Sequence, residues 1–244
     1  MLVALTLLVA ALIRTFLVQP FFIPSGSMEN TLRVGDRVLV DKVSYRLGDI
    51  HRGDVVVFNG LDSFSPEVTV YTGGNPLARG LRRIGGAVGM APPGEKDFIK
   101  RVIGVPGDHV VCCDANHLVT VNGTALSESS YLYPHDIASE TRFDVTVPSG
   151  RLWVMGDHRS QSADSRAHTG DPGGGTVPES KVIGRAFTVV WPLGHATGLG
   201  TPTTYGRVGS PVAGPAAGSP YALVLAAVPP LVMVRRRRRS GTES

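Results

Sequence analysis

The stretch IPSGSMENTL, residues 23–32, places Ser27 between a glycine and a methionine, directly after a largely apolar run. A serine hydroxyl is a weak nucleophile unless a neighbouring base removes its proton. Ser27 is therefore either an ordinary turn residue or the nucleophile of a hydrolase. The second interpretation requires a base elsewhere in the chain.

A candidate base lies in the segment FIKRVIGVPGD, residues 98–108. A lysine can accept a proton near neutral pH only where burial brings its pKa from about 10.4 towards roughly 7 to 8, at a cost on the order of 4 kcal/mol. Lys100 lies in an apolar run that suits this requirement. Arg101 follows it and, on a strand, should face the opposite side and keep its charge away from the amine.

Two further segments complete a pattern: RGDVVVF at residues 52–58 and MGDHRSQSADSR at residues 155–166. Together and in this order, the four segments resemble those of bacterial signal peptidase I, the membrane-bound serine peptidase that removes signal peptides from exported proteins. The resemblance covers about residues 14–192. Any one segment would be weak evidence for this family, whereas four segments in the same order form a specific pattern.

The resemblance implies the catalytic roles. Ser27 would be the nucleophile and Lys100 the general base. The Ser25 hydroxyl would form the oxyanion hole together with the backbone N–H of Ser27. In the last segment, Ser162 would orient the lysine amine, and Gly156 would let two chain segments approach closely.

The same segment also contains Asp164 and Arg166, which the resemblance implies to be a supporting ion pair. It departs from the family at His158 and at the pair Ser160 and Gln161, where asparagine, aspartate and asparagine are common. His158 raises a rival mechanism, in which a histidine base is oriented by Asp157. The intact lysine segment favours Lys100.

The expected substrate is an extended stretch of a preprotein that adds to a sheet edge beside Ser27. Alternate side chains of a strand point the same way, so the residues one and three places before the cut would enter shallow pockets together. Both would have to be small, as in the A-x-A rule of signal peptides. The residues expected to line these pockets are Phe21, Ile23, Pro24, Leu32, Ile99 and Met155. For each of them, a place in the ordinary hydrophobic core is the alternative.

The elements that must position these residues are strands. Short segments rich in β-branched residues alternate with turn signals such as PGD, NG and PSG. We expect a mainly β catalytic body of packed or partly closed antiparallel sheets over residues 21–193. The Gly-rich stretch 60–96 is interpreted as an insertion; its arginines Arg79, Arg82 and Arg83 allow a membrane-surface segment, but a mobile loop is favoured.

Both ends of the chain are expected to meet a membrane. Residues 1–20 predict an uncleaved N-terminal anchor, either with Arg14 snorkelling to an interface or truncated at its start, since the features of a cleavable signal peptide are missing. Residues 194–219 are interpreted as a Gly/Pro-rich linker and 220–234 as a second span, with a frayed tail as the alternative. The basic tail 235–244 would be cytoplasmic and the catalytic body extracytoplasmic, at the plasma membrane.

Composition excludes several classes. The chain has 244 residues, of which 42% are hydrophobic, so it can bury a sizeable core. Five of its 24 basic residues form the run 235–239, which leaves 19 against 20 acidic residues, so a nucleic-acid-binding face is not expected. Cys112 and Cys113 rule out a disulfide framework and a zinc spacing; two small wall residues are favoured over a vicinal disulfide. We expect no metal and no cofactor.

The expected partners are therefore signal-peptide-bearing preproteins and the lipid bilayer. Two other functions stay open. One is a catalytically inactive, membrane-anchored relative that only binds export substrates. The other is a self-cleaving serine–lysine repressor of similar fold, which would need a cytosolic location and a DNA-binding domain; the apolar start argues against it.

Overall fold

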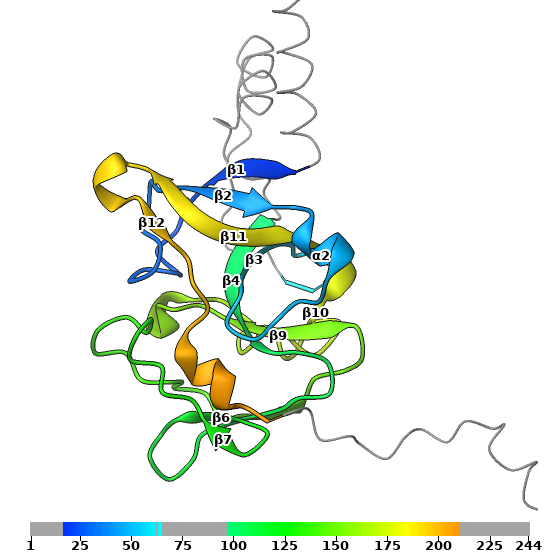
Figure 1. Cartoon of the computed structure of the whole chain (residues 1–244). Helices are drawn as coiled ribbons and strands as arrows, with labels where there is room; N and C mark the ends of the chain where they lie inside the picture. The colour runs from blue at the N-terminus through cyan, green and yellow to red at the C-terminus, as the bar shows by residue number, and fades with distance from the viewer. Residues whose placement is uncertain (1–16, 62, 65–96, 210–244) are drawn as a thin grey trace, which may run out of the picture. The chain divides into compact units, whose positions relative to one another are not determined.

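A computed structural model describes residues 17–61, 63–64 and 97–209 (Figure 1). The chain divides into two compact units, residues 1–212 and 213–244, and every described residue belongs to the first. Within this described part, no helix is both long and apolar enough to cross a bilayer. Most of the predicted N-terminal anchor, most of the insertion, and the predicted C-terminal span and basic tail lie outside the described residues.

The larger sheet holds the chemistry-bearing segments. Its neighbouring strands all pair antiparallel. In spatial order they are β1 (Val18–Phe22), β2 (Arg37–Asp41), β11 (Val182–Trp191), β3 (Val55–Asn59), β4 (Asp97–Gly104), β9 (Arg151–Met155) and β10 (Val177–Pro178), with β12 (Thr197–Gly198) added to β11.

A smaller antiparallel sheet follows β4 in the chain. Its spatial order is β7 (Thr124–Ala125), β6 (Val119–Val121), β5 (His109–Cys112) and β8 (Phe143–Thr146). Helical structure among the described residues is confined to α2 (Ser44–Leu47) and the 3₁₀ turns η1 (Arg159–Gln161), η2 (Glu179–Lys181), η3 (Leu193–His195) and η4 (Thr203–Arg207). The prediction of a mainly β body of antiparallel sheets is confirmed.

The burial of each strand follows from its sequence. Strand β2 alternates, with Val38 and Val40 buried between partly exposed neighbours. Strands β3 and β4 lie inside the sheet and are buried along nearly their whole length. Because both faces of these two strands are covered, their apolar residues do not alternate with exposed ones, and Lys100 of β4 lies among them.

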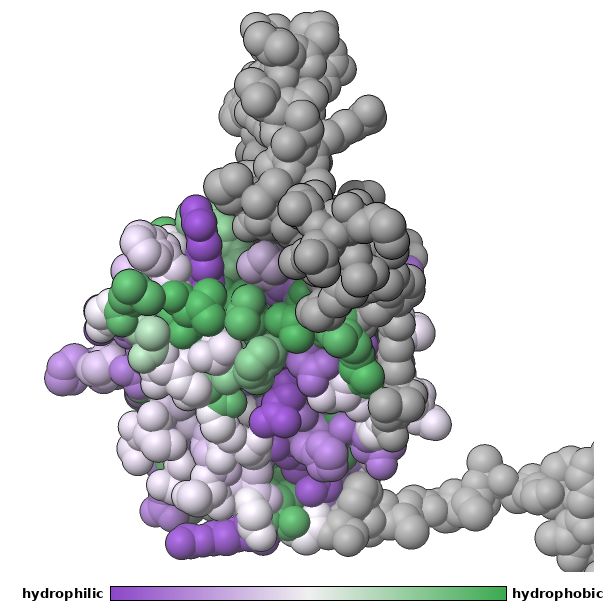
Figure 2. Space-filling model, turned by 45° about the horizontal axis from the view of Figure 1, so that its top comes forward, coloured by the Kyte–Doolittle hydropathy of each residue, from purple (hydrophilic) through white to green (hydrophobic). Residues whose placement is uncertain are grey.

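Some apolar side chains remain outside the core. A band of apolar residues crosses the face shown in Figure 2. Val34 lies just before β2. Trp191 is the last residue of β11 and is 52% exposed, and Leu193, which follows β11, is 75% exposed. They lie at the same end of the sheet, because Trp191 pairs with Arg37. Packing within the described body does not account for these side chains.

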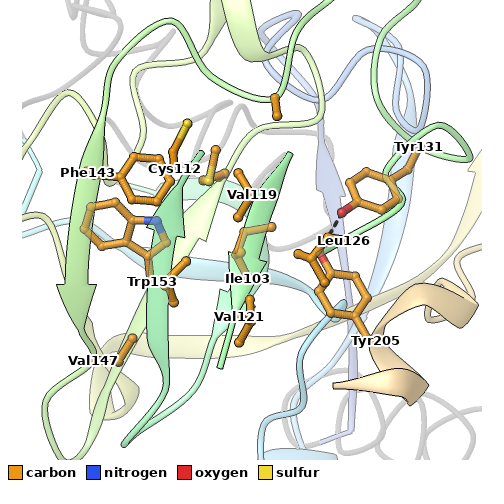
Figure 3. Close-up of a cluster of buried hydrophobic side chains, with 13 residues drawn as sticks. Ile103, Cys112, Val119, Val121, Leu126, Tyr131, Phe143, Val147, Trp153 and Tyr205 are labelled. Carbon is orange, nitrogen blue, oxygen red and sulfur yellow. Dashed lines mark hydrogen bonds between the residues drawn. The ribbon is translucent and has the colours of Figure 1, made fainter. Parts of the chain in front are cut away.

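One cluster of buried hydrophobic side chains lies beside the smaller sheet (Figure 3). Its centre is Trp153 of β9, whose ring packs against Phe143 of β8 with 5.2 Å between ring centroids. Cys112 is buried in this cluster and Cys113 packs against it. The two cysteines form a disulfide with each other. Their favoured interpretation as two separate wall residues is therefore wrong, and the vicinal disulfide is the observed arrangement.

The expected boundary between anchor and body at residue 20 is wrong. Residues 18–20 belong to β1, whose partners run from Val18 opposite Asp41 to Phe22 opposite Arg37. An apolar edge strand and the end of an apolar helix have the same composition, so composition alone could not separate them. The β body begins at least three residues earlier than expected.

The expected linker beginning at residue 194 is also wrong over its first part. Strand β12 pairs with β11, and Tyr205 of η4 is only 6% exposed. Its hydroxyl lies 2.8 Å from that of Tyr131, as the dashed line in Figure 3 marks. Gly53 leaves room for the ring, because a Cβ there would lie 2.6 Å from Tyr205 Cδ2. This stretch is a strap on the body, not a flexible connection.

The start of the expected insertion likewise belongs to the core. Phe64 is buried and meets Phe58 edge-on, with 5.4 Å between ring centroids. It also contacts Phe98 of β4. The described part of the body therefore extends at least to Phe64, five residues beyond the end at residue 59 that the composition indicated.

Replacing Tyr205 by alanine should lower the free energy of unfolding by about 3 to 5 kcal/mol, because a buried aromatic ring and its hydrogen bond are removed. The measurement is urea denaturation of the full-length protein. The control is Leu193→Ala at the exposed residue just before this stretch, which should change stability by less than about 0.5 kcal/mol. Equal small effects of the two variants would contradict the strap.

Candidate active site

The structure brings Ser27 and Lys100 together. Lys100 lies on β4 opposite Val56 of β3, and Ser27 lies in the turn that follows β1. The two side chains are 2% and 1% exposed, and Lys100 Nζ donates a hydrogen bond to Ser27 Oγ at 2.7 Å. A hydroxyl and an amine at this separation can exchange a proton directly.

Ser25 lies beside the same hydroxyl. The Oγ atoms of Ser25 and Ser27 are 3.4 Å apart. The backbone N–H of Ser27 donates to no backbone carbonyl among the described residues. The Ser25 hydroxyl and this N–H are the two donors that the expected oxyanion hole requires.

Gly156 and Ser162 lie against the nucleophile. A Cβ atom built on Gly156 would overlap both Ser162 Oγ and the backbone oxygen of Ser27, so only glycine fits. Ser162 Oγ is buried and makes no hydrogen bond in the described structure. The sequence led us to expect a hydrogen bond from this hydroxyl to the Lys100 amine, and that bond is not formed here.

Asp164 and Arg166 form a buried pair behind the glycine. Arg166 Nε and one terminal nitrogen donate to the two carboxylate oxygens at 2.8 Å, and the Gly156 N–H donates at 2.9 Å. Burial alone would raise the pKa of Asp164, but the hydrogen bonds and charge of Arg166 and the Gly156 N–H hold that pKa below its usual 3.8. Asp164 is therefore an ionised structural support.

The rival histidine base is not assembled. Asp157 accepts hydrogen bonds from Arg101 at 2.8 and 2.6 Å and from Thr31. The His158 ring instead places its Nδ1 3.2 Å from the carbonyl oxygen of Gly26. Because an arginine holds both oxygens of Asp157, that carboxylate does not orient His158.

Arg101 and Asp157 were missed as a pair in the sequence. They are 56 residues apart, and no local spacing links them. Arg101 also donates to the carbonyl of Gly53 and lies over the Tyr131 ring, with 4.4 Å to the centroid. These partners do not include Ser27, to which Lys100 donates, in line with the alternation expected along β4. A buried arginine without a carboxylate partner would be costly. An arginine within a buried strand was therefore the one sign in the sequence that a carboxylate must lie close to it.

Four of the six expected pocket residues share a wall. A small hollow of about 20 Å³ lies between the end of β1 and the start of β4, and its lining includes Phe21, Ile23, Pro24 and Ile99. Leu32 and Met155 are fully buried in two different core clusters. Neither of these two lines the hollow.

A serine hydroxyl bonded to a buried lysine amine, on a body of antiparallel sheets, defines the class of serine–lysine hydrolases. Comparison with protein families agrees: the family model described as signal peptidase, peptidase S26, matches residues 1–191. The chain belongs to this family. Its members are serine peptidases.

Individual relatives carry the same description. The "Probable signal peptidase I" of Mycobacterium leprae is 43% identical over 213 residues, which cover 77% of this chain and 73% of the relative. The "Signal peptidase I" of Mycobacterium tuberculosis is 44% identical over 197 residues, covering 73% of this chain and 66% of the relative. A crystal structure of a signal peptidase I from Enterococcus faecalis aligns at 22% identity with a TM-score of 0.33, covering 56% of this chain and 96% of that one.

Replacing Gly156 by alanine should remove most peptidase activity, because the new methyl group displaces either Ser162 or the backbone of Ser27. We expect a loss of at least about 10²-fold in kcat/KM, as for a displacement of about 1 Å in an active site. Gly170→Ala is the matched control, since no atom lies within 4 Å of a Cβ there. Full activity of Gly156→Ala would show that the close approach is unnecessary.

Asp164 should make folding sensitive to acid. Since its pKa is lower in the folded than in the unfolded chain, its charge stabilises the fold above about pH 4, and this contribution is lost as the pH falls through the folded-state value. Asp164→Asn should therefore lose less stability than wild type between about pH 5 and pH 2. Denaturation at each pH measures this, with the exposed Glu140→Gln as a control that keeps the wild-type profile. A steeper acid dependence in Asp164→Asn would contradict the assignment.

Proposed function

We infer that this protein is a signal peptidase I: a serine endopeptidase that cleaves signal peptides from exported preproteins, after small residues in A-x-A segments. Ser27 is the nucleophile and Lys100 the general base. The observation that carries this proposal is the 2.7 Å contact between two buried side chains, in a chain that belongs to the signal peptidase family.

The proposed reaction is acyl transfer. Ser27 Oγ attacks the scissile carbonyl while the Lys100 amine takes its proton. Collapse of the tetrahedral intermediate breaks the C–N bond, and Lys100 returns the proton to the leaving amine. A water molecule then gives its proton to the same amine and attacks the acyl-enzyme, which releases the signal peptide and restores Ser27.

The remaining polar residues support this reaction. The Ser25 hydroxyl and the Ser27 N–H stabilise the oxyanion. Ser162 is buried beside Gly156 without a partner, so its hydroxyl is available to the amine when Lys100 becomes protonated. Asp164 and Arg166 fix the chain on which Ser162 lies.

The substrate is proposed to lie along the start of β4. Among the described residues, β9 joins β4 only from Arg101 onwards, so residues 97–100 pair with β3 on one side alone. The hollow of about 20 Å³ borders this stretch. A volume of this size holds about one water-sized group, which is about the size of an alanine methyl. Leu32 packs in the same core cluster as Phe21, Ile23 and Ile99 and can support this wall from within, whereas Met155 belongs to another cluster.

Membrane attachment completes the proposal. The apolar residues 1–17 form the N-terminal anchor and 220–234 a second span. The body is extracytoplasmic, at the plasma membrane, and the basic tail 235–244 is cytoplasmic. Ser27 follows Leu17 by ten residues, so it lies within roughly 35 Å of the point where the anchor ends. Sharing the membrane with its substrates raises their effective concentration at the site.

An inactive relative that only binds export substrates is the alternative. Such a protein would have no need to keep Ser27 and Lys100 in contact inside a dry site, so the contact favours the enzyme. A self-cleaving repressor is disfavoured, because the match to the signal peptidase family runs from the apolar start to residue 191.

Ser27→Ala and Lys100→Ala should each lower cleavage of a preprotein with an A-x-A site by at least about 10³-fold, because each removes one member of a unit that acts together. The measurement is conversion to the mature form by full-length protein in detergent or vesicles. Lys181→Ala, outside the site, should cleave like wild type. Binding of the preprotein by folded wild type without cleavage would favour the inactive relative.

A further inference from the structure

We propose that His158 positions and polarises the oxyanion donor, the backbone N–H of Ser27. This inference rests on the proposed function, and it gives a role to the residue at which the chain departs from its family. His158 touches no reacting atom in this role; it acts through the peptide unit that joins Gly26 to Ser27.

The Gly26 carbonyl and the Ser27 N–H belong to the same planar peptide unit. In a trans peptide these two groups point in opposite directions, so fixing the carbonyl fixes the N–H. The Gly26 oxygen accepts a hydrogen bond from the Glu29 N–H at 2.9 Å and faces His158 Nδ1 at 3.2 Å. Because a carbonyl oxygen can only accept, Nδ1 must carry the proton.

The same histidine also holds the other side of the nucleophile. Its backbone N–H donates to the carbonyl oxygen of Ser27 at 3.1 Å. His158 therefore contacts the peptide before Ser27 with its side chain and the peptide after it with its backbone. Rotation of either peptide unit would break one of these bonds.

The ring itself is held in place. It stacks on Tyr133, with 3.8 Å between ring centroids and 15° between planes, and the Tyr133 N–H donates to the carbonyl of Asp157 at 2.9 Å. A carboxylate oxygen of Glu29 lies 3.4 Å from Nδ1 and favours the same protonated nitrogen. Since Arg101 occupies the carboxylate of Asp157, that group does not draw the ring away.

A hydrogen bond to a carbonyl also strengthens the N–H of the same peptide as a donor, by about 10 to 30%. The contribution grows as negative charge develops on the oxyanion, so it acts mainly in the transition state. The family's common asparagine can supply a comparable N–H from its amide. In this chain the histidine ring N–H thus takes the place of the asparagine amide N–H.

The test compares donors and non-donors of similar shape at residue 158. His158→Phe keeps a ring that can stack on Tyr133 but has no hydrogen-bond donor. His158→Asn and His158→Leu are similar in size, and only the asparagine has an amide N–H to donate. We expect kcat of the Phe and Leu variants to fall about 10-fold with KM within about twofold, less than the 10²- to 10³-fold loss of a whole oxyanion donor. His158→Asn should stay within about threefold of wild type.

A second readout separates this role from a merely structural one. A peptide aldehyde with an A-x-A sequence forms a tetrahedral adduct with Ser27, and the corresponding peptide alcohol does not. The affinity for the aldehyde should fall with kcat in the Phe and Leu variants, while the affinity for the alcohol should not change. If His158→Phe does not fold, the pair of Asn and Leu variants decides alone.

Several outcomes would overturn the inference. They are wild-type kcat in both non-donor variants, equal loss of aldehyde and alcohol binding, or an Asn variant as slow as the Leu variant. Each of them leaves the proposed function intact, provided that wild type cleaves the preprotein. Failure of wild type to cleave would instead refute the proposed function.

Discussion

The hydrogen bond between Lys100 and Ser27 requires two polar groups to leave water together. Neither side chain is more than 2% exposed, and their polar atoms are 2.7 Å apart. A buried amine without a partner would be costly, so the serine must be held where the amine already is. Strand β4 cannot adjust easily, because it pairs with β3 and, from Arg101 onwards, with β9. The turn after β1 must therefore be fixed by other contacts.

Buried pairs of arginine and carboxylate provide that support. The segment that follows β9 contributes at least one partner to each of three such pairs: Arg101 with Asp157, Arg159 with Glu128, and Arg166 with Asp164. Such pairs add little net stability, because removing both charges from water is costly, but their bidentate bonds define geometry. Thr31 bonds to the first pair, which ties the serine turn to this support.

The sequence predicted what local pattern controls and missed what depends on distant partners. Strands β3, β4 and β9 have apolar runs that identify them, and the resemblance brought Ser27 and Lys100 together before any coordinates. The first three residues of strand β1 were assigned to the anchor, because an apolar edge strand and the end of an apolar helix have the same composition. Tyr205 stands alone among glycines, prolines and threonines, and its partner Tyr131 is 74 residues away, so no local signal marked the strap.

The buried pairs also decide which group can act as the base. The carboxylate of Asp164 accepts from Arg166 and from the Gly156 N–H, and that of Asp157 accepts from Arg101, so their charges are matched and their oxygens occupied. Among the residues that the structure describes, Lys100 is the basic side chain that bonds to Ser27 Oγ. The contacts thus support the proposed lysine base over the histidine, because arginines bond to both acids and the histidine faces a backbone carbonyl.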